Sequence, residues 1–486
     1  MRMLLKLSGK KAQQPRNAMF GARGPTVTLA PLFEVRAPQG AAVVGAATMG
    51  AAGAADATWY TAEVTGPAGF GAASAHPWDL AHDLLQRGLA INGQRLLAVE
   101  PDMEQGWTWE QDGTPNPAFA AAREGDKPEK EMGAPYDKGG SFAWHLDDAH
   151  SGLRAASTAV GAAAQKAITI VHLDTGFDPN HLTRPVNLDL ARARNFVEGG
   201  TDATDQTPTG GVLLNRGHGT GTLGILAGGY HPDLLAVPAN FGPIGGAPFA
   251  TVVPVRVANS VVHFGTSAVA RGIDYAREIG ADVLSMSMGG LPSDAWADAV
   301  NAAYEAGVVL VCAAGNSFAG LPTSLIVYPA RFNRVIAACG VMAAGHPYYG
   351  FQDLGKMEGC AGPMGKMNTA LAAYTPNTPW ARLGRANIVD MDGAGTSSAT
   401  PQVAAACAAM IASRVAISSA RRRSSFRMSR AGAGTVWRMA GESAGATPRR
   451  NNSNGSLNPR IIRLTVLEKP NLRRIFLLRK RCGRTM

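Results

Sequence analysis

Three short segments of the chain combine small residues with side chains that can move protons or attack a carbonyl group. They read DTG at 174–176, GHGTGT at 217–222 and GTSSATP at 395–401. The carboxylate of the first could orient an imidazole, and the glycines of the second leave its histidine approachable. The serine of the third would lie at a helix N-terminus, where backbone N–H groups favour developing negative charge.

Each segment also has a simpler interpretation. Asp and Gly favour turns, and DTG is also the signature of aspartic proteases, which need two copies where this chain has one. The glycines at 219, 221 and 224 match a dinucleotide fingerprint, yet residues 210–216 make a poor strand and no acidic residue ends a strand near 244. Ser397 could equally be an N-cap, which is a common role for serine.

A fourth segment adds an amide side chain. The apolar run at 309–314 leads into Gly315 and Asn316, so a strand would deliver the Asn316 side chain at its end. An asparagine amide in that place can donate a hydrogen bond to an oxyanion.

The elements around these segments predict a parallel α/β sheet. Continuous apolar runs are typical of strands buried on both faces, and the chain has several, separated by helical stretches. This alternation favours a sheet covered by helices on both faces, with its active site at the carboxyl ends of the strands. The predicted strands are 167–173, 251–257, 282–288 and 308–313, and the predicted helices are 267–279, 294–306 and 402–412.

Taken together, the four segments resemble the subtilisin-like serine peptidases. The order Asp, His, Ser along the chain is the subtilisin order. The resemblance covers about residues 144–415 and predicts a subtilisin-like fold. The matching segments are IVHLDTG at 170–176, GHGT at 217–220, AAGN at 313–316, YPA at 328–330 and GTSSATP at 395–401.

The resemblance implies a mechanism. Ser397 is expected to be the nucleophile toward a peptide carbonyl, with His218 as its general base and Asp174 as the residue that orients His218. Asn316 and the backbone N–H of Ser397 are expected to stabilise the oxyanion. The predicted function is therefore that of a serine endopeptidase. The alternative is a catalytically silent or truncated subtilisin-like domain that acts as a binding module.

The resemblance also implies where a protein or peptide substrate binds. An extended substrate could pair with the glycine backbone of an edge strand. The pocket walls carry no charge, which favours a medium or large apolar side chain before the cleaved bond. The mechanism requires no metal, and no dense Asp/Asn loop marks a calcium site of the kind that many family members have. The expected substrate-binding residues are Ser287, Met288, Gly289, Gly290 and Gly315.

The N-terminal part of the chain predicts a smaller unit. Residues 1–56 form a leader that is first basic and then Ala/Gly-rich. Residues 57–101 predict a small α+β domain, which is either propeptide-like or an unrelated accessory domain. Residues 102–143 predict a linker, and 144–417 the peptidase domain.

The basic excess of the chain lies at its C-terminus. The chain has 46 Lys+Arg and 36 Asp+Glu, for a net charge of +10. Residues 421–486 hold 17 Lys+Arg and 2 Glu, which leaves residues 1–420 with a net charge of −5. We expect the tail at 418–486 to be irregular. It could bind nucleic acid or acidic surfaces, be a solvated extension, or have lost its native reading frame, and we favour the last.

Cysteines and targeting signals say little about function. Five widely spaced cysteines indicate neither a disulfide framework nor a zinc site, and Cys312 and Cys407 are expected in the core. The first apolar run ends at Leu5, too early for a secretory signal, and no window is long enough to span a membrane. We expect no membrane span and favour a cytoplasmic location, with secretion left open.

Overall fold

The computed structural model of the protein describes residues 2–10, 16–19, 26–35, 56–65, 76–86, 88, 90–106, 143–160, 167–209, 214–230, 242–261, 263–318, 323–343, 345, 347–348, 357–424, 435–439, 460–461 and 464–468. The predicted Ala/Gly-rich stretch and most of the predicted linker lie outside these residues.

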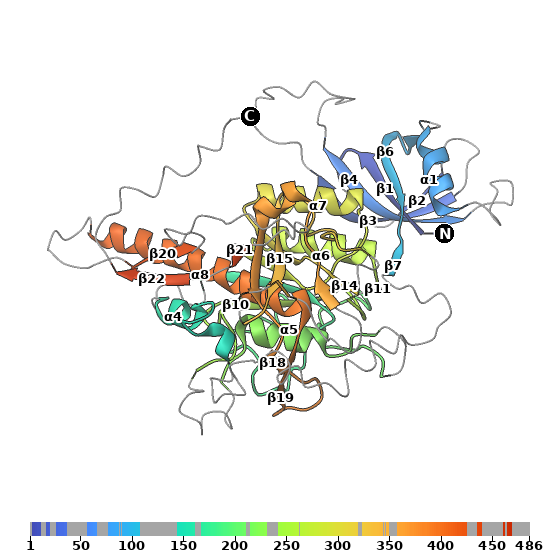
Figure 1. Cartoon of the computed structure of the whole chain (residues 1–486). Coiled ribbons are helices and arrows are strands. Elements are labelled where there is room, and N and C mark those ends of the chain that lie inside the picture. The colour runs from blue at the N-terminus through green and yellow to red at the C-terminus, as the bar shows by residue number, and fades with distance from the viewer. Residues whose placement is uncertain are drawn as a thin grey trace, which may run out of the picture.

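A parallel sheet of eight strands forms the centre of the main domain (Figure 1). Its strand order is β21-β17-β15-β13-β12-β8-β10-β9, and every neighbouring pair is parallel. The predicted parallel sheet is therefore confirmed. The strands are β8 (Thr169–Asp174), β9 (Arg194–Asn195), β10 (Thr251–Arg256), β12 (Val283–Met286), β13 (Val309–Ala313), β15 (Val335–Val341), β17 (Ala370–Tyr374) and β21 (Arg460–Ile461).

Helices cover both faces of this sheet. Side chains alternate along a strand, so Val171 packs with the core beneath α6 and α7, whereas Ile170 packs with the core beneath α5 and α8. His172 and Asp174 consequently share the face of Ile170 and point toward α5. The helices are α4 (Leu153–Thr158), α5 (His218–Ala227), α6 (Thr266–Glu278), α7 (Asp294–Glu305) and α8 (Gly395–Ser424), with 3₁₀ turns η2 (Trp144–Leu146) and η6 (Met364–Thr369).

Short antiparallel pairs lie beside the main sheet. They are β14 (Asn316–Phe318) with β16 (Met357–Gly359), and β18 (Thr378–Ala381) with β19 (Val389–Gly393). Both pairs lie next to segments that carry predicted site residues. The hairpin of β18 and β19 precedes α8 along the chain, and β18 packs against α5.

The predicted ends of the four strands β8, β10, β12 and β13 differ from the observed ones by at most two residues. Helix α8 differs more, because it begins at Gly395 and not at 402. Ser397 therefore lies in the first helical turn, and Pro401 lies inside the helix.

The N-terminal domain is a six-stranded antiparallel sheet in the order β2-β3-β4-β1-β6-β5. The strands and helix expected within 57–101 are present, but three further strands lie where a leader was predicted. Alternating Met3, Leu5 and Leu7 enter this domain's core, while Leu4 packs into the core of the main domain. The elements are β1 (Arg2–Ser8), β2 (Arg16–Met19), β3 (Thr26–Val35), β4 (Ala57–Thr65), α1 (Pro77–Gln86), β5 (Ala90–Ile91) and β6 (Gln94–Pro101).

Two acidic residues of the N-terminal domain cap helices of the main domain. Glu100 accepts hydrogen bonds from the backbone N–H groups of Asp294 (2.9 Å) and Ala295 (3.1 Å) at the start of α7. Asp102 accepts one from the N–H of Ser267 (3.0 Å) at the start of α6. A carboxylate at a helix N-terminus satisfies N–H groups that have no partner inside the helix. The N-terminal domain therefore packs against α6 and α7 (Figure 1).

The C-terminal tail is more regular than predicted. Helix α8 continues to Ser424, and β20 (Thr435–Met439) pairs antiparallel with β22 (Leu464–Glu468). Strand β21 joins the main sheet beside β17, where it pairs with backbone groups that would otherwise form a free edge. The remaining tail residues lie outside the described part of the chain.

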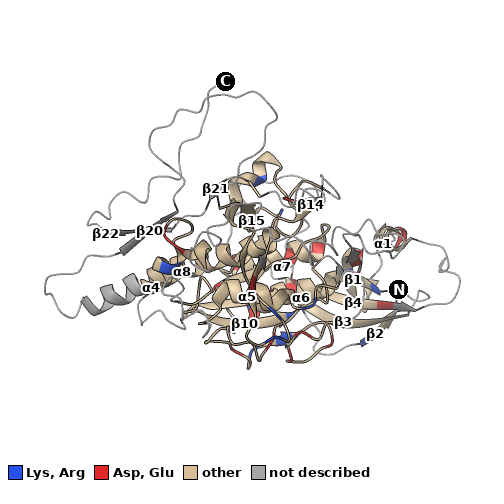
Figure 2. Ribbon diagram, turned by 60° about the horizontal axis from the view of Figure 1, so that its bottom comes forward, with Lys and Arg blue, Asp and Glu red and all other residues tan. Residues whose placement is uncertain are grey.

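The charged residues and cysteines of the described part of the chain indicate no other candidate site. Figure 2 shows acidic and basic residues scattered over the described elements. Within these residues no helix is long and apolar enough to cross a membrane, and no group of three His, Cys, Asp or Glu side chains could hold a metal. Cys312 and Cys407 are buried free thiols, as predicted.

Candidate active site

Asp174 lies at the carboxyl end of β8 and is fully buried. Its Oδ1 accepts hydrogen bonds from His218 Nδ1 at 2.7 Å and from the backbone N–H of Thr175 at 2.8 Å. Burial acts to raise the pKa of Asp174, but the charge and hydrogen bond of His218 outweigh it, so the pKa lies below that of an ordinary carboxyl. Asp174 is therefore an ionised residue that orients an imidazole.

His218 is the first residue of α5, and the glycines that follow it allow close packing. A Cβ built on Gly219 would lie 2.0 Å from the carbonyl oxygen of Gly176. A Cβ on Gly221 would lie 2.0 Å from the ring of Trp380. Gly219 thus allows the helix start to lie against the DTG segment and Gly221 leaves room for Trp380, which explains both glycines without a nucleotide.

Trp380 on β18 packs against the His218 ring edge to face, with 5.5 Å between ring centroids. This contact and the hydrogen bond to Asp174 fix the plane of the imidazole from two sides. The other ring nitrogen of His218, Nε2, is buried and has no hydrogen-bond partner among the described residues. A nitrogen in that state is available to a nucleophile or a substrate.

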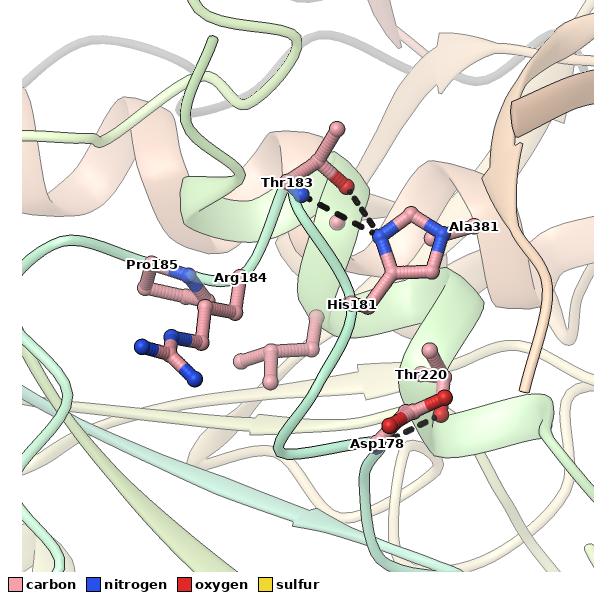
Figure 3. A pocket seen from close by; sticks show the side chains of 9 residues that line it. Asp178, His181, Thr183, Arg184, Pro185, Thr220 and Ala381 are labelled. Atoms are coloured by element: carbon pink, nitrogen blue, oxygen red, sulfur yellow. Dashed lines mark hydrogen bonds between the residues drawn. The ribbon is translucent and has the colours of Figure 1, made fainter. Parts of the chain in front are cut away.

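The loop after Asp174 is tied to α5 and to the hairpin of β18 and β19 around a small pocket (Figure 3). The backbone N–H of Asp178 donates to Thr220 Oγ1 at 3.0 Å, and the Asp178 carboxylate accepts from the N–H of Gly384 at 2.7 Å. His181 Nε2 lies 2.9 Å from the carbonyl oxygen of Ile388, while its Nδ1 lies 2.9 Å from Thr183 Oγ1. Both ring nitrogens of His181 are thus used to hold the loop.

Asn316 lies against the start of α8. Its Oδ1 accepts the backbone N–H of Thr396 at 2.9 Å, so its Nδ2 is the atom left to donate. Gly395 has a φ of +71°, and a Cβ there would lie 2.9 Å from that Nδ2. The amide of Asn316 is therefore held one residue from Ser397, with its donor end beside the helix N-terminus.

Ser397 lies in the first turn of α8, and its hydroxyl is turned toward Ser287. Ser397 Oγ is 3.4 Å from the carbonyl oxygen of Ser287, and Ser287 Oγ donates to the carbonyl oxygen of Ser397 at 3.0 Å. No hydrogen bond joins Ser397 to His218 within the described residues. Catalytic hydrogen bonds are often long or misaligned in a protein without substrate.

Two of the predicted substrate-binding residues, Gly289 and Gly315, lie on either side of the Val327 side chain. Gly290 and Tyr328 exchange two backbone hydrogen bonds, of 2.7 and 3.0 Å. A Cβ on Gly289 would lie 2.5 Å from Val327 Cγ2, and a Cβ on Gly315 would lie 3.0 Å from the same atom. Val327 therefore reaches the two glycine segments from between them, and Met288 is buried beside them.

Three residues of the site were not predicted from the sequence. They are His172 and Thr222, which lie beside Asp174, and Trp380, which lies beside His218. Period-2 alternation along β8 would have placed His172 on the face of Asp174. Helical spacing would have placed Thr222 one turn after His218. Nothing in the sequence relates Trp380 to a histidine 162 positions away.

Comparison with known proteins identifies the family of the chain. A model of the subtilase family matches residues 165–441. Subtilisin DY of Bacillus licheniformis is 30% identical over 241 residues, which is 49% of this chain and 74% of the relative. Thermitase of Thermoactinomyces vulgaris is 34% identical over 250 residues, covering 51% and 74%. The major intracellular serine protease of Bacillus subtilis (strain 168) is 33% identical over 251 residues, covering 50% and 68%.

Among solved structures, a mutant of the protease domain of PatA aligns with a TM-score of 0.40 and 21% identity, over 52% of this chain and 82% of that one. This likeness is too distant to add to the assignment. The family match spans more than half of the chain and includes all four predicted segments. The chain belongs to the subtilase family.

Proposed function

We propose that the protein is a serine endopeptidase in which Asp174, His218 and Ser397 act together. Family membership supports peptidase chemistry in general. The single observation that carries the finer proposal is the 2.7 Å bond between buried Asp174 and His218, which leaves His218 Nε2 without a partner. Ser397 Oγ reaches this nitrogen when a peptide is bound, loses its proton to it and attacks the peptide carbonyl.

The developing oxyanion needs donors that are already oriented. We assign this role to Asn316 Nδ2 and the backbone N–H of Ser397. The hydrogen bond from the Thr396 N–H to Asn316 Oδ1 supports the assignment, because it engages the amide oxygen and leaves Nδ2 to donate to an oxyanion. The chemistry requires no metal ion, since proton transfer and charge stabilisation both come from side chains and backbone.

Replacing Asn316 by leucine is expected to lower kcat by about 10²–10³-fold with little change in KM, because the donor acts mainly in the transition state. Ser317→Ala is the matched control, since the neighbouring Ser317 hydroxyl is buried without a partner in the described residues. Steady-state kinetics on a chromogenic peptide would check both variants. Equal kcat values for the wild type and Asn316→Leu would remove Asn316 from the mechanism.

We also propose that the pocket formed by Ser287, Met288, Gly289, Gly290 and Gly315 takes an apolar side chain. The apolar side chain of Val327 packs between Gly289 and Gly315, which makes the surroundings of these residues apolar. No charged residue is among these pocket residues. A strict preference for Arg or Lys before the cleaved bond, measured on a peptide library, would contradict this pocket.

A fluorophosphonate probe tests the peptidase proposal directly. The probe reacts with a serine only when a base and an oxyanion site activate it. Digestion and mass spectrometry of the treated chain should place the adduct on Ser397. Absence of an adduct on folded protein would favour the alternative of a catalytically silent domain.

For the N-terminal domain we propose a propeptide-like role, in which it covers the substrate edge of the main domain. Strand β7 (Glu104–Gly106) pairs antiparallel with β11 (His263–Gly265). Strand β11 follows β10, whose last residue pairs with Asp174. A strand added there occupies backbone groups that an extended substrate could use.

Glu100→Ala is expected to lower the free energy of unfolding by about 1–2 kcal/mol, because Ser293 Oγ and two N–H groups of α7 lose their acceptor. Urea denaturation followed by intrinsic fluorescence would measure it. Exposed Glu63 on β4 gives the control, and Glu63→Ala should change little. If the domain shields the site, Glu100→Ala should also speed the labelling of Ser397. An unchanged labelling rate in a destabilised variant would favour an accessory role.

A further inference from the structure

The Asp174 carboxylate has a second set of partners that the proposed mechanism does not use. Its Oδ2 accepts a hydrogen bond from Thr222 Oγ1 at 3.0 Å. Thr222 Oγ1 in turn lies 2.9 Å from His172 Nε2. All three side chains are buried. We propose that His172 and Thr222 form a relay, called here the His172–Thr222 relay, that positions Asp174 for its work on His218.

The protons that these side chains carry determine which atom donates in each hydrogen bond of the relay. An ionised carboxylate only accepts, so the single hydroxyl proton of Thr222 goes to Asp174 Oδ2. The competing acceptors, the carbonyl oxygens of His218 and Gly219, are neutral and farther away, at 3.2 and 3.3 Å. The remaining lone pair of Thr222 Oγ1 must then accept from His172 Nε2–H. Each donor in the row therefore points toward the catalytic carboxylate.

The charge state of His172 matters as much as its position. Burial lowers the pKa of His172 to about 4, against the opposing pull of Asp174. The residues paired with His172 on the neighbouring strands are Pro254 and Ser285, which are uncharged. A neutral His172, 3.8 Å from Asp174 Oδ2, orients the carboxylate without competing for its charge. Asp174 can then stabilise the imidazolium that forms at His218.

Other charges near Asp174 are already engaged. Arg256 pairs beside Asp174 on β10, and its Nε and Nη2 bind the Glu198 carboxylate at 3.0 and 2.8 Å. Asp205 accepts hydrogen bonds from Thr175 Oγ1 and the backbone N–H of Gly217. Within the described residues, His218 and His172 are therefore the titratable groups in direct reach of the Asp174 carboxylate.

The inference rests on the proposed function, because it concerns the residue that orients the general base. Thr222→Val removes the hydroxyl at nearly constant shape. We expect kcat to fall about tenfold with KM within about twofold. The acid limb of the plot of kcat/KM against pH should move up by about half a pH unit. A carboxylate that loses a donor is more basic, and it therefore holds the protonated form of His218 more strongly. Thr222→Ser should recover most of the loss.

His172 acts only through Thr222, which makes a double-mutant cycle decisive. His172→Leu alone should lower kcat about threefold, and His172→Gln should recover it, since its amide can donate. In the Thr222→Val background, His172→Leu should cost nothing further. Thr400→Val is the matched control, because among the described residues the partner of that buried hydroxyl is the Thr396 carbonyl of its own helix. A purely structural role would lower the melting temperature without moving kcat or the acid limb.

A second readout does not need turnover. In the full chain carrying Ser397→Ala, the low-field proton resonance of the Asp174–His218 bond should shift in Thr222→Val and return in Thr222→Ser. If wild type fails to hydrolyse peptides while this resonance responds, the proposed function falls and the relay stands. An unchanged resonance, or full additivity in the cycle, overturns the relay. Should Thr222→Val not fold, Thr222→Cys gives the same test with a weak donor of similar size.

Discussion

Ser397→Ala is expected to reduce peptide hydrolysis by about 10⁶-fold, the magnitude known for removal of a triad member in a subtilisin. Ser397 lies in the first turn of α8, where the helix dipole and free N–H groups favour an oxyanion. Alanine removes the nucleophile and leaves the helix, its dipole and the Asn316 contact in place. The residual rate should be limited to what orientation and the oxyanion donors supply.

The adjacent Ser398 provides the control for this variant. Its hydroxyl is buried and donates to the carbonyl oxygen of Ala394 at 3.0 Å within the same turn. Ser398→Ala should therefore cost some stability and almost no turnover. Adding His218→Ala to Ser397→Ala should cost almost nothing further, because the two residues act as a unit. Retention of substantial activity in Ser397→Ala would mean that the nucleophile lies elsewhere.

The central sheet could be predicted from the sequence because its strands are buried on both faces. Such strands read as continuous apolar runs, and β8, β10, β12 and β13 begin and end within two residues of those runs. The N-terminal strands could not be found in this way. Strand β1 is buried less continuously, because its seven residues include Arg2 and Lys6, and one of its four buried residues, Leu4, packs into the core of the main domain.

The residues of the site likewise fall into those that the sequence predicts and those that it does not. Asp174, His218, Asn316 and Ser397 each lie in a short segment whose neighbours are small, and the segments carry the information. The carboxyl ends of parallel strands and the starts of the following helices then bring them to one edge of the sheet. His172, Thr222 and Trp380 lie within or opposite those segments, yet their roles depend on which face a side chain takes. That information belongs to the fold and only weakly to the sequence.

The C-terminal tail shows a limit of a different kind. Composition predicted an irregular segment, because basic residues are frequent and amphipathic order is weak. Strand β21 nevertheless extends the main sheet through backbone pairing with β17. Backbone hydrogen bonds depend little on side-chain type, so composition is a poor guide to whether such a strand forms.

Asp174→Asn is expected to lower kcat/KM by about 10⁴-fold with little change in KM. The Asn side chain would offer either an amide NH₂ or a carbonyl oxygen to His218 Nδ1. The second orientation keeps the correct tautomer, but it turns the NH₂ toward Thr222, whose proton must then go to the more distant carbonyl oxygen of His218 or Gly219. The first keeps the Thr222 bond and forces the His218 proton onto Nε2, where the imidazole can no longer accept from Ser397. Thr222 therefore favours the inactive arrangement, whereas the N–H of Thr175, which donates to the oxygen that faces His218, favours the active one. We expect the bond to Thr222 to decide the orientation.

Asp178→Asn is the matched control, because Asp178 is a buried carboxylate four residues on whose hydrogen-bond donors, within the described part of the chain, are backbone N–H groups. It should lower stability while leaving kcat within a few fold. Combining Asp174→Asn with Thr222→Val frees the amide to turn, so activity should recover in part relative to Asp174→Asn alone. Kinetics on the three variants would check this order. Equal activity of Asp174→Asn with and without Thr222→Val would show that Thr222 does not control the orientation of residue 174, and a kcat near wild type in Asp174→Asn would remove Asp174 from the mechanism.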